Sequence, residues 1–183
     1  MSNLADIALI AQIITLKSSS AFKVLMERYQ KDVRRYLLSL TGGNKALADD
    51  LSQECFIKVY QRLNTFKQLS SFKSWLYRIA TNCFYDYLRS EKPHDNIEDT
   101  PDYLLENNQQ QNLGQQMDVN EALQVLTVIE RTCVTLFYME DIKIEKIASI
   151  TDIPINTVKS HLKRGREKMA HFLSENGYNL DHL

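Results

Sequence analysis

Five residues near the C-terminus recur at intervals that place them on one face of a helix. The steps between Val158, Leu162, Gly165, Met169 and Leu173 are four, three, four and four residues. Side chains at this spacing stack on a single side of an α-helix and form an apolar stripe. The segment therefore predicts an amphipathic helix that packs this stripe against the rest of the chain.

The opposite face of the same predicted helix is basic. The whole chain has a formal net charge of −1. Between Pro154 and Ala170, however, a single acid, Glu167, faces five basic residues: Lys159, Lys163, Arg164, Arg166 and Lys168. A short helix expected over residues 145–151 and a turn precede this helix. Two helices with a tight turn and a basic outer face are typical of a DNA-binding helix-turn-helix, and a solvated surface helix is the alternative.

Composition favours an all-α protein. Five Gly and three Pro in 183 residues leave few sites for the tight turns of a sandwich or barrel. The apolar spacing is helical almost throughout. Cys55, Cys83 and Cys133 lie far apart without a C-x-x-C pair, which predicts buried thiols rather than a zinc or disulfide site. We expect no cofactor and no metal.

We expect a cytoplasmic protein without direct membrane insertion. No segment has the long uncharged run of a membrane span. The first residues, Met1-Ser-Asn-Leu-Ala-Asp6, lack the basic start and cleavage site of a signal peptide.

The distribution of charge predicts two small helical domains joined by an acidic linker. Residues 1–92 hold fourteen Lys/Arg and eight Asp/Glu, residues 93–125 hold no Lys or Arg and seven acids, and residues 126–183 hold eight of each. The acidic stretch is rich in Gln and Asn and bracketed by prolines, so it reads as a linker. We assign residues 1–92 to an N-terminal domain, 93–117 to the linker and 118–183 to a C-terminal helix-turn-helix domain.

Four helices are predicted in the N-terminal domain. The first runs from about 4 to 16, with Ile7, Ile10 and Ile14 on one side. Serines 18–20 supply candidate N-caps for the second, which stops at Gly42-Gly43. The third runs from 44 to about 63, and the fourth from about 71 to 91, before Pro93.

Two stretches of this domain suggest partners. Asp50, Gln53 and Glu54 share a helix face with Lys58 one turn on, which indicates a partner surface or, equally, an ordinary solvated face. The stretch from Thr65 to Arg89 interleaves aromatic residues with Lys67, Lys73, Arg78 and Arg89. Basic residues can neutralise phosphates, and aromatic faces can stack on unpaired bases. Several of these aromatics are expected to be core, Phe72 and Trp75 above all.

Four segments in order resemble a known family. They are Ala48-Asp-Asp-Leu-Ser-Gln-Glu-Cys-Phe56, Phe72-Lys-Ser-Trp-Leu-Tyr-Arg-Ile-Ala-Thr-Asn82, Asp86-Tyr-Leu-Arg89 and Thr157-Val-Lys-Ser-His-Leu-Lys-Arg-Gly-Arg166. Together they resemble the extracytoplasmic-function (ECF) sigma factors of bacterial RNA polymerase. The resemblance covers roughly residues 20–92 and 118–175. It implies a protein without catalysis of its own that binds core polymerase and directs promoter-specific initiation.

The resemblance also implies a role for each surface. Core polymerase would be bound by Asp50, Gln53, Glu54, Phe56 and Lys58. The −10 promoter element would be bound, with one base flipped out, by the loop 64–71 together with Lys67, Lys73, Arg78, Asn82 and Arg89. The −35 element would be read as duplex by Asn156, Thr157, Lys159, Ser160, His161, Lys163, Arg164 and Arg166. Members of this family are usually held inactive by an anti-sigma factor, often membrane-anchored.

Two departures from the family pattern have physical consequences. Thr127 stands where the family commonly has proline, and with Glu130 it predicts a capping box that starts a helix. His161 stands where arginine is frequent, so the charge at that position depends on pH.

Two rival interpretations assign the chain to other classes of protein, a transcription regulator and an enzyme. An ordinary helix-turn-helix regulator would share the C-terminal domain but would not need the surface around Asp50 or the basic-aromatic stretch. For an enzyme, the four histidines show no metal-ligand spacing. The sequence also has no phosphate-binding glycine loop and no nucleophile elbow.

Overall fold

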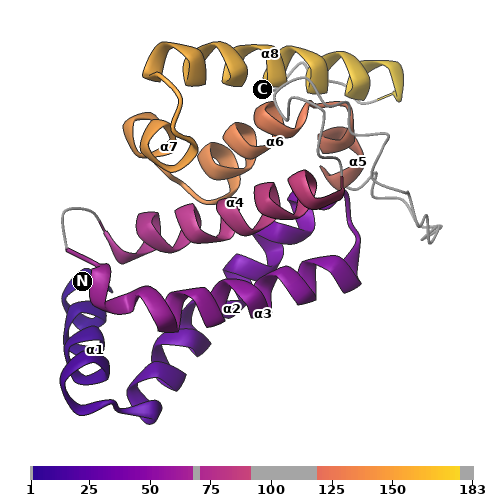
Figure 1. Cartoon of the computed structure of the whole chain (residues 1–183). Helices are drawn as coiled ribbons and strands as arrows, with labels where there is room; N and C mark the ends of the chain where they lie inside the picture. Colours follow the sequence, from indigo (N-terminus) through magenta and orange to yellow (C-terminus); the bar gives the residue numbers. More distant parts are fainter. Residues whose placement is uncertain (1, 68–70, 92–118, 178–183) are drawn as a thin grey trace.

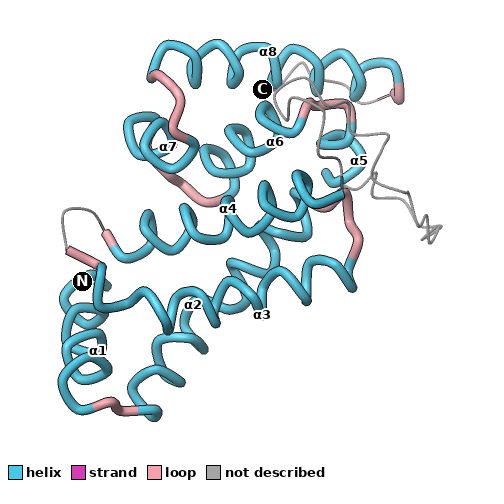
Figure 2. The backbone as a smooth tube through the Cα atoms, viewed as in Figure 1, coloured by secondary structure: helices cyan, strands magenta, loops and turns pink. Residues whose placement is uncertain are grey.

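The computed structural model describes residues 2–67, 71–91 and 119–177, and in these ranges the secondary structure is helical (Figure 2). The all-α prediction is confirmed. The predicted acidic linker, residues 93–117, lies outside the described residues.

The N-terminal half consists of four α-helices and one short 3₁₀ turn. They are α1 (Ser2–Leu16), α2 (Ser19–Leu40), α3 (Lys45–Arg62), η1 (Leu63–Thr65) and α4 (Phe72–Glu91). Helix α2 packs against α1, α3 and α4, and α3 also packs against α4. The core between them is formed by apolar side chains that include Leu25, Val33, Leu37, Leu51, Val59, Leu76 and Phe84.

Short polar residues define where these helices begin. The Ser18 Oγ accepts a hydrogen bond from the Ala21 amide at 3.2 Å, and the Asn44 Oδ1 accepts one from the Leu47 amide at 3.1 Å. Each satisfies a backbone donor that the first helical turn leaves unpaired. Between α2 and α3 the chain turns through Gly42 and Gly43, both with positive φ. The breaks predicted after residues 16 and 40 are therefore confirmed.

Helix α1 packs with a face that includes the predicted isoleucines and extends beyond them. Ile10 is buried, Ile7 and Ile14 are partly buried, and Ile13 is buried as well. The buried face also includes Asp6, which accepts a hydrogen bond from the Tyr29 hydroxyl at 2.5 Å and pairs with Arg28. Burial, reinforced by this hydrogen bond, raises the pKa of Tyr29, so its hydroxyl remains a donor. The spacing of the isoleucines does not reveal this polar contact between α1 and α2.

The C-terminal half is built around α8. Its elements are α5 (Val119–Gln124), α6 (Val128–Val134), the π-helical turn η3 (Thr135–Met139), α7 (Ile144–Thr151) and α8 (Ile155–Glu175). The predicted capping box is confirmed at the start of α6. The Thr127 Oγ1 accepts from the Glu130 amide at 3.4 Å, and the Glu130 carboxylate accepts from the Thr127 amide at 3.1 Å.

Helix α8 lies across α6 and α7 through the predicted apolar stripe. Val158, Leu162 and Gly165 are buried, and Met169 and Leu173 are partly buried. At Gly165 the two helices approach so closely that a Cβ there would lie 2.7 Å from the Val134 Cγ2. Glycine at this position therefore permits the close packing of α6 and α8.

The two halves pack against each other, with α4 between them (Figure 1). Helix α4 contacts α7, while α2 contacts α6 and η3.

The three cysteines are free and buried, as predicted, and burial raises the pKa of the Cys133 thiol to about 12.

Replacing Gly165 by alanine is expected to lower the free energy of unfolding by about 1 kcal/mol, because overpacking costs roughly 1–3 kcal/mol and the better helix propensity of alanine returns about 1 kcal/mol. Val134 is β-branched and cannot easily turn away. Chemical denaturation followed by circular dichroism measures the change. In a Val134→Ala background the same substitution should become neutral or stabilising. An equal loss in both backgrounds would show that the clash with Val134 is not the cause.

Candidate nucleic-acid interface

Helices α7 and α8 form the predicted helix-turn-helix. Helix α7 ends at Thr151, and its C-cap Asp152 has a φ of 57°, the left-handed conformation that commonly ends a helix. Pro154 caps the start of α8, and its carbonyl accepts from the Val158 amide at 3.0 Å. The first helix begins at Ile144, one residue before the predicted start.

One side of α8 is open to solvent. Asn156, Lys159, Ser160, Lys163 and Arg166 are exposed, whereas Thr157 and His161 are half-buried. The Ser160 hydroxyl donates to the carbonyl of Asn156 at 3.0 Å, and Lys163 lies 3.9 Å from Glu167. This side of α8 presents basic and amide groups of the kind that contact base edges and phosphates.

Two further basic residues of α8 point towards Glu130 of α6. The Lys168 Nζ lies 2.7 Å from the Glu130 Oε2, and the Arg164 Nε lies 3.4 Å from the Oε1. The Arg164 Nη2 is also 2.9 Å from the His161 Nδ1. Arg164 is exposed, as predicted, but its guanidinium is held against α6 rather than directed straight outward.

Glu130 combines two tasks at this junction. Its carboxylate completes the capping box of α6 and neutralises cations of α8 while its side chain is only 4% exposed. Burial raises the pKa of Glu130, but hydrogen bonds from Lys168 and from the Thr127 amide outweigh it, so the net pKa is lowered from 4.5. The side chain is therefore a carboxylate at neutral pH and fixes α8 on α6.

The predicted partner surface on α3 is partly as expected. Asp50, Gln53 and Glu54 are exposed. Phe56, however, is only 8% exposed and packs in the core, because its position on α3 faces the other helices. The structure therefore does not present Phe56 on this surface.

Lys58 forms ion pairs beside this surface. Its Nζ lies 2.7 Å from Glu54 and 3.3 Å from Asp86 of α4, and the side chain is largely buried. Burial lowers the pKa of Lys58, but the hydrogen bonds to Glu54 and Asp86 and the neighbouring negative charge together outweigh it and raise the pKa to about 12. Lys58 therefore stays charged and orients both acids.

Two apolar residues of α3 were missed by the sequence analysis. Ile57 and Tyr60 are 58% and 50% exposed, and the Tyr60 ring packs edge-on against Phe22 at 4.9 Å. They follow Gln53 at steps of four and three residues, a signal that could have placed them beside it. Exposed apolar side chains next to acids are typical of a protein-binding surface.

The residues predicted for the −10 element divide into two groups. Lys67, Asn82 and Arg89 are exposed, and Arg89 pairs with Asp86 at 2.9 Å. Residues 68–70 of the predicted base-capturing loop lie outside the described residues. Phe72 is buried, as predicted, and Trp75 is partly buried, with its ring 5.5 Å from Phe66.

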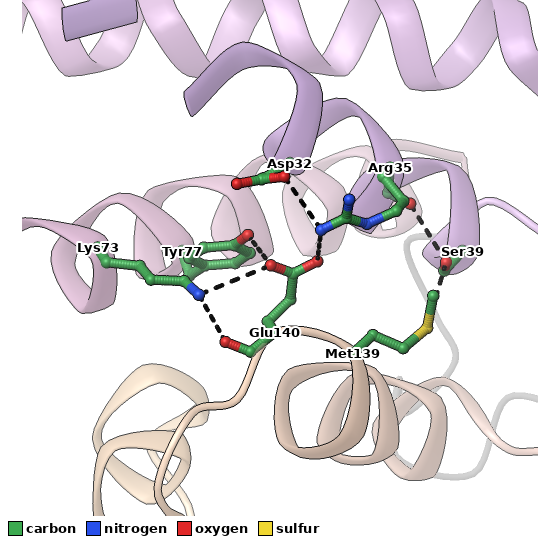
Figure 3. A network of polar contacts seen from close by, with 7 residues as sticks. All are labelled: Asp32, Arg35, Ser39, Lys73, Tyr77, Met139 and Glu140. Atoms are coloured by element: carbon green, nitrogen blue, oxygen red, sulfur yellow. Dashed lines mark hydrogen bonds and ion pairs between the residues drawn. The ribbon is translucent and has the colours of Figure 1, made fainter. Parts of the chain in front are cut away.

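The second group, Lys73 and Arg78, contacts the C-terminal half. The Lys73 Nζ donates to the Glu140 carbonyl at 2.6 Å, and the Arg78 Nη2 lies 2.7 Å from the Asp152 Oδ2 and 2.9 Å from the Oδ1. Figure 3 shows the first of these contacts within a network that joins α2, α4 and the end of η3.

Glu140 is the centre of that network and was not singled out from the sequence. Its side chain is 1% exposed, receives the Tyr77 hydroxyl, lies 3.0 Å from the Arg35 Nη2 and 3.9 Å from the Lys73 Nζ. Burial, with the hydrogen bond to Glu140, raises the pKa of Tyr77, which keeps its hydroxyl a donor. Each of these partners is distant in sequence, so no local pattern reveals the cluster.

Within the described ranges, the side chains form no cluster of His, Cys, Asp and Glu suited to a metal ion. None of the helices in those ranges is long and apolar enough to cross a membrane.

Comparison with known proteins places these surfaces in context. The family model for Sigma-70 region 2 matches residues 25–94, and that for Sigma-70 region 4 matches residues 116–169. The ECF RNA polymerase sigma factor SigM of Bacillus subtilis (strain 168) is 32% identical over 149 residues, which cover 79% of this chain and 90% of that protein. The ECF RNA polymerase sigma-E factor of Haemophilus influenzae is 32% identical over 178 residues, 90% of this chain and 93% of that protein.

Two solved structures show the same fold. The sigma factor RpoE from Bartonella quintana, in complex with the anti-sigma factor NepR, matches with a TM-score of 0.68 and 23% identity over 84% of this chain and 96% of that one. CnrH, in complex with the cytosolic domain of CnrY, matches with a TM-score of 0.70 and 21% identity over 94% and 99%. At these identities the likeness shows the fold alone.

Acid is expected to loosen α8 from α6 through Glu130. Because the folded-state pKa is lowered, its stabilisation is complete above the unfolded value of about 4.5 and is lost as the pH falls through the folded value. At pH 7, Glu130→Gln should cost about 1.5–3 kcal/mol, the range for a hydrogen bond to a charged group. Denaturation midpoints measured from pH 7 to 3 should fall less steeply for this variant than for wild type. The exposed Glu145→Gln variant is the control, and an identical pH profile for all three proteins would contradict the assignment.

Proposed function

The chain belongs to the ECF sigma factors of RNA polymerase, and from this premise we propose which surface performs each step of promoter recognition. As a sigma factor it binds core RNA polymerase and directs promoter-specific initiation through the −10 and −35 elements. Sigma factors are DNA-binding initiation factors, and we propose that this one has no catalytic activity of its own. An independent helix-turn-helix regulator is not favoured, because a region 2 match precedes the region 4 match. We propose residues 1–92 and 118–183 as the two domains, with residues 93–117 as linker.

The exposed face of α3 is the proposed docking site for core polymerase. Asp50, Gln53 and Glu54 supply polar and acidic contacts, and Lys58 holds Glu54 in place. Ile57 and Tyr60 add apolar area next to them, which a purely polar face would lack. Phe56 is buried beneath this face and packs α3 onto the core. A mixed apolar and acidic patch of this kind fits a partner with basic and apolar side chains.

The −10 element is the proposed ligand of α4 and the segment before it. Lys67, Asn82 and Arg89 are exposed, and Lys73 and Arg78 of α4 contact Glu140 and Asp152 on either side of α7. Capture of an unpaired base would join strand opening to sequence recognition, since a base presents its pairing edge only after it leaves the stack.

The −35 element is the proposed ligand of α8. Asn156, Lys159, Ser160 and Lys163 are placed to reach base edges of the major groove, with Thr157 at the start of the helix. Arg166 would contact phosphates, and Arg164 and His161 would do so from the flank where they contact each other. The single observation that carries this proposal is the open basic side of α8 within a matched region 4.

We place the protein in the cytoplasm, where bacterial polymerase transcribes, and propose an anti-sigma factor as its regulator. Two structurally similar proteins were solved in complex with such a partner or with a cytosolic domain. An anti-sigma factor that covered α3 or α4 would block the surfaces proposed above.

Removing two acids of the α3 surface is expected to weaken binding to core polymerase. Asp50→Ala/Glu54→Ala should raise the dissociation constant by roughly tenfold or more, the loss of about 1.4 kcal/mol or greater that central interface residues typically cause. Purified bacterial core polymerase and labelled protein allow a direct titration. The control, Glu27→Ala/Glu175→Ala, removes the same charge from exposed positions elsewhere. No binding by folded wild type would contradict the function, and equal binding by both variants would contradict the site.

Two variants of α8 should separate base readout from phosphate contact. Lys159→Ala is expected to relax sequence preference at one −35 position by about 1–3 kcal/mol, the value of one base contact. Arg166→Ala should weaken binding to all sequences and reduce the salt slope by about 0.9. Holoenzyme bound to a promoter library randomised in the −35 element, followed by sequencing at several salt concentrations, measures both. A change of preference with Arg166→Ala alone would reverse the assignment.

A further inference from the structure

We propose that Cys55 of α3 and Cys83 of α4 are a dithiol that a peroxide oxidises to a disulfide, and that this bond weakens the docking of α3 on core polymerase. Neither cysteine belongs to the surfaces assigned above. The effect on docking rests on the proposed function of α3, whereas the oxidation itself requires only this chain.

The two thiols meet where α3 packs against α4 (Figure 1). Both side chains are 0% exposed and lie in the same apolar core. The Cys55 thiol donates a hydrogen bond to the Cys83 sulfur. A disulfide requires side chains that already point at one another, and a hydrogen bond between the thiols meets this condition. Cys133, by contrast, lies on α6 in the other half of the chain.

Ion pairs next to the thiols fix the same register of the two helices. Lys58 lies one turn after Cys55 on α3, and its side chain reaches back so that the Nζ lies 2.7 Å from the Glu54 Oε1. The same Nζ lies 3.3 Å from the Oδ2 of Asp86, which is one turn after Cys83 on α4. Lys58 also hydrogen-bonds to the Cys83 sulfur. Its ammonium therefore links the buried pair to the surface.

The surroundings of the two thiols assign a different role to each. The hydrogen bond from Cys55, together with the Lys58 ammonium, lowers the pKa of the Cys83 thiol and outweighs its burial. The same hydrogen bond and burial raise the pKa of Cys55. Because the thiolate is the form that attacks an oxidant, Cys83 reacts first and Cys55 resolves the product. Burial, with the charge of Glu130, raises the pKa of Cys133 to about 12 and keeps it an unreactive thiol.

The oxidation balances with a peroxide as the only co-reactant. The Cys83 sulfur attacks one peroxide oxygen, the S–O bond forms, the O–O bond breaks, and the leaving hydroxide takes the thiol proton to become water. The Cys55 sulfur then attacks the sulfur of this sulfenic acid, the S–S bond forms, the S–O bond breaks, and a second water leaves with the Cys55 proton. The two thiols lose two electrons, and the peroxide gains them. Disulfides in a reducing compartment are usually of this transient, redox-sensing kind.

Access to the thiols is controlled by Lys58. Both thiols are buried, whereas the Lys58 side chain is 21% exposed and those of Glu54 and Asp86 are 48% and 54% exposed. Ion pairs at a surface contribute little to stability, so these contacts open readily. A peroxide is small and reaches Cys83 when they open, so the folded chain can be oxidised.

The disulfide would change the docking face because Cys55 lies in the same turn of α3. It stands between Glu54, which belongs to that face, and Phe56, which packs α3 onto the core. Covalent closure draws this turn towards α4. It also removes the negative charge of the Cys83 sulfur, which leaves the Lys58 ammonium more strongly bound to Glu54. Both changes oppose docking, since an interface depends on close fit and on complementary charge.

Treatment of the full chain with hydrogen peroxide tests the modification. Free thiols are counted with a maleimide in denaturant, and mass spectrometry of the intact and digested chain identifies the bond. Of the three thiols, two should be lost, with a mass lower by two hydrogens and a linked peptide that joins Cys55 to Cys83. Dithiothreitol should reverse the change. Three free thiols, or a bond that includes Cys133, would overturn the proposal. This measurement uses wild type, so it does not depend on how a core substitution folds.

Single substitutions test the role of each thiol. Cys55→Ala should stop at a sulfenic acid on Cys83 that dimedone labels, and Cys83→Ala should give neither the label nor the bond. Cys133→Ala is the matched control, and it should form the disulfide at the wild-type rate. Equal labelling of Cys55→Ala and Cys83→Ala would overturn the assignment of the attacking thiol.

Oxidised wild type, freed of peroxide, is then titrated with core polymerase. Its dissociation constant should be roughly tenfold higher than that of the reduced chain, a loss typical of a disturbed central interface residue, and should return after reduction. Cys83→Ala should bind equally before and after the treatment. Equal binding by fully oxidised and reduced wild type would overturn the effect on docking. Failure of the reduced chain to bind polymerase would contradict the proposed function instead, and the thiol count, which involves no polymerase, separates the two failures.

Discussion

The relation between the two halves depends on one carboxylate that is withdrawn from water at their junction. Isolated, a buried carboxylate costs several kcal/mol, so it persists only where charged and polar donors surround it. Glu140 finds them in Arg35 of α2 and Tyr77 of α4, which belong to the other half of the chain. Because its solvation requires both halves, the packing of α4 against α7 and of α2 against η3 is tied to this side chain. The π-helical turn η3 precedes it directly, and such turns often occur where a helix must place a functional group.

Charge segregation explains how a chain of net charge −1 can serve a polyanion. Lys73 and Arg78 of α4 are paired with carboxylates of the C-terminal half, Glu140 and Asp152. Arg164 and Lys168 of α8 are paired with Glu130 of α6. Local pairing of this kind reduces the long-range attraction of these cations to DNA and leaves the exposed basic residues of α8 as the groups that face solvent.

Sequence predicted those features that short segments encode. Ser18 and the Thr127–Glu130 pair cap helices by contacts three residues away, as expected, and Asn44, expected as the first residue of its helix, is the N-cap of α3. The stripe from Val158 to Gly165 predicted the buried side of α8 for the same reason. Features that depend on distant partners were missed or misjudged. Asp6 is buried on α1 through Tyr29 and Arg28 of α2, and Phe56 is buried in the core although it was predicted on a partner surface. Glu140 has no local signature at all, because its partners lie more than sixty residues away.

The C-terminal half has two buried carboxylates, Glu130 and Glu140, whose partners come from different parts of the chain. Glu130 takes its partners from within that half, the Thr127 amide and Lys168 of α8. Glu140 takes its partners from the other half, Arg35 of α2 and Lys73 of α4, and so joins the two halves. The first carboxylate fixes α8 on α6, and a fixed helix is what precise contacts with base edges require.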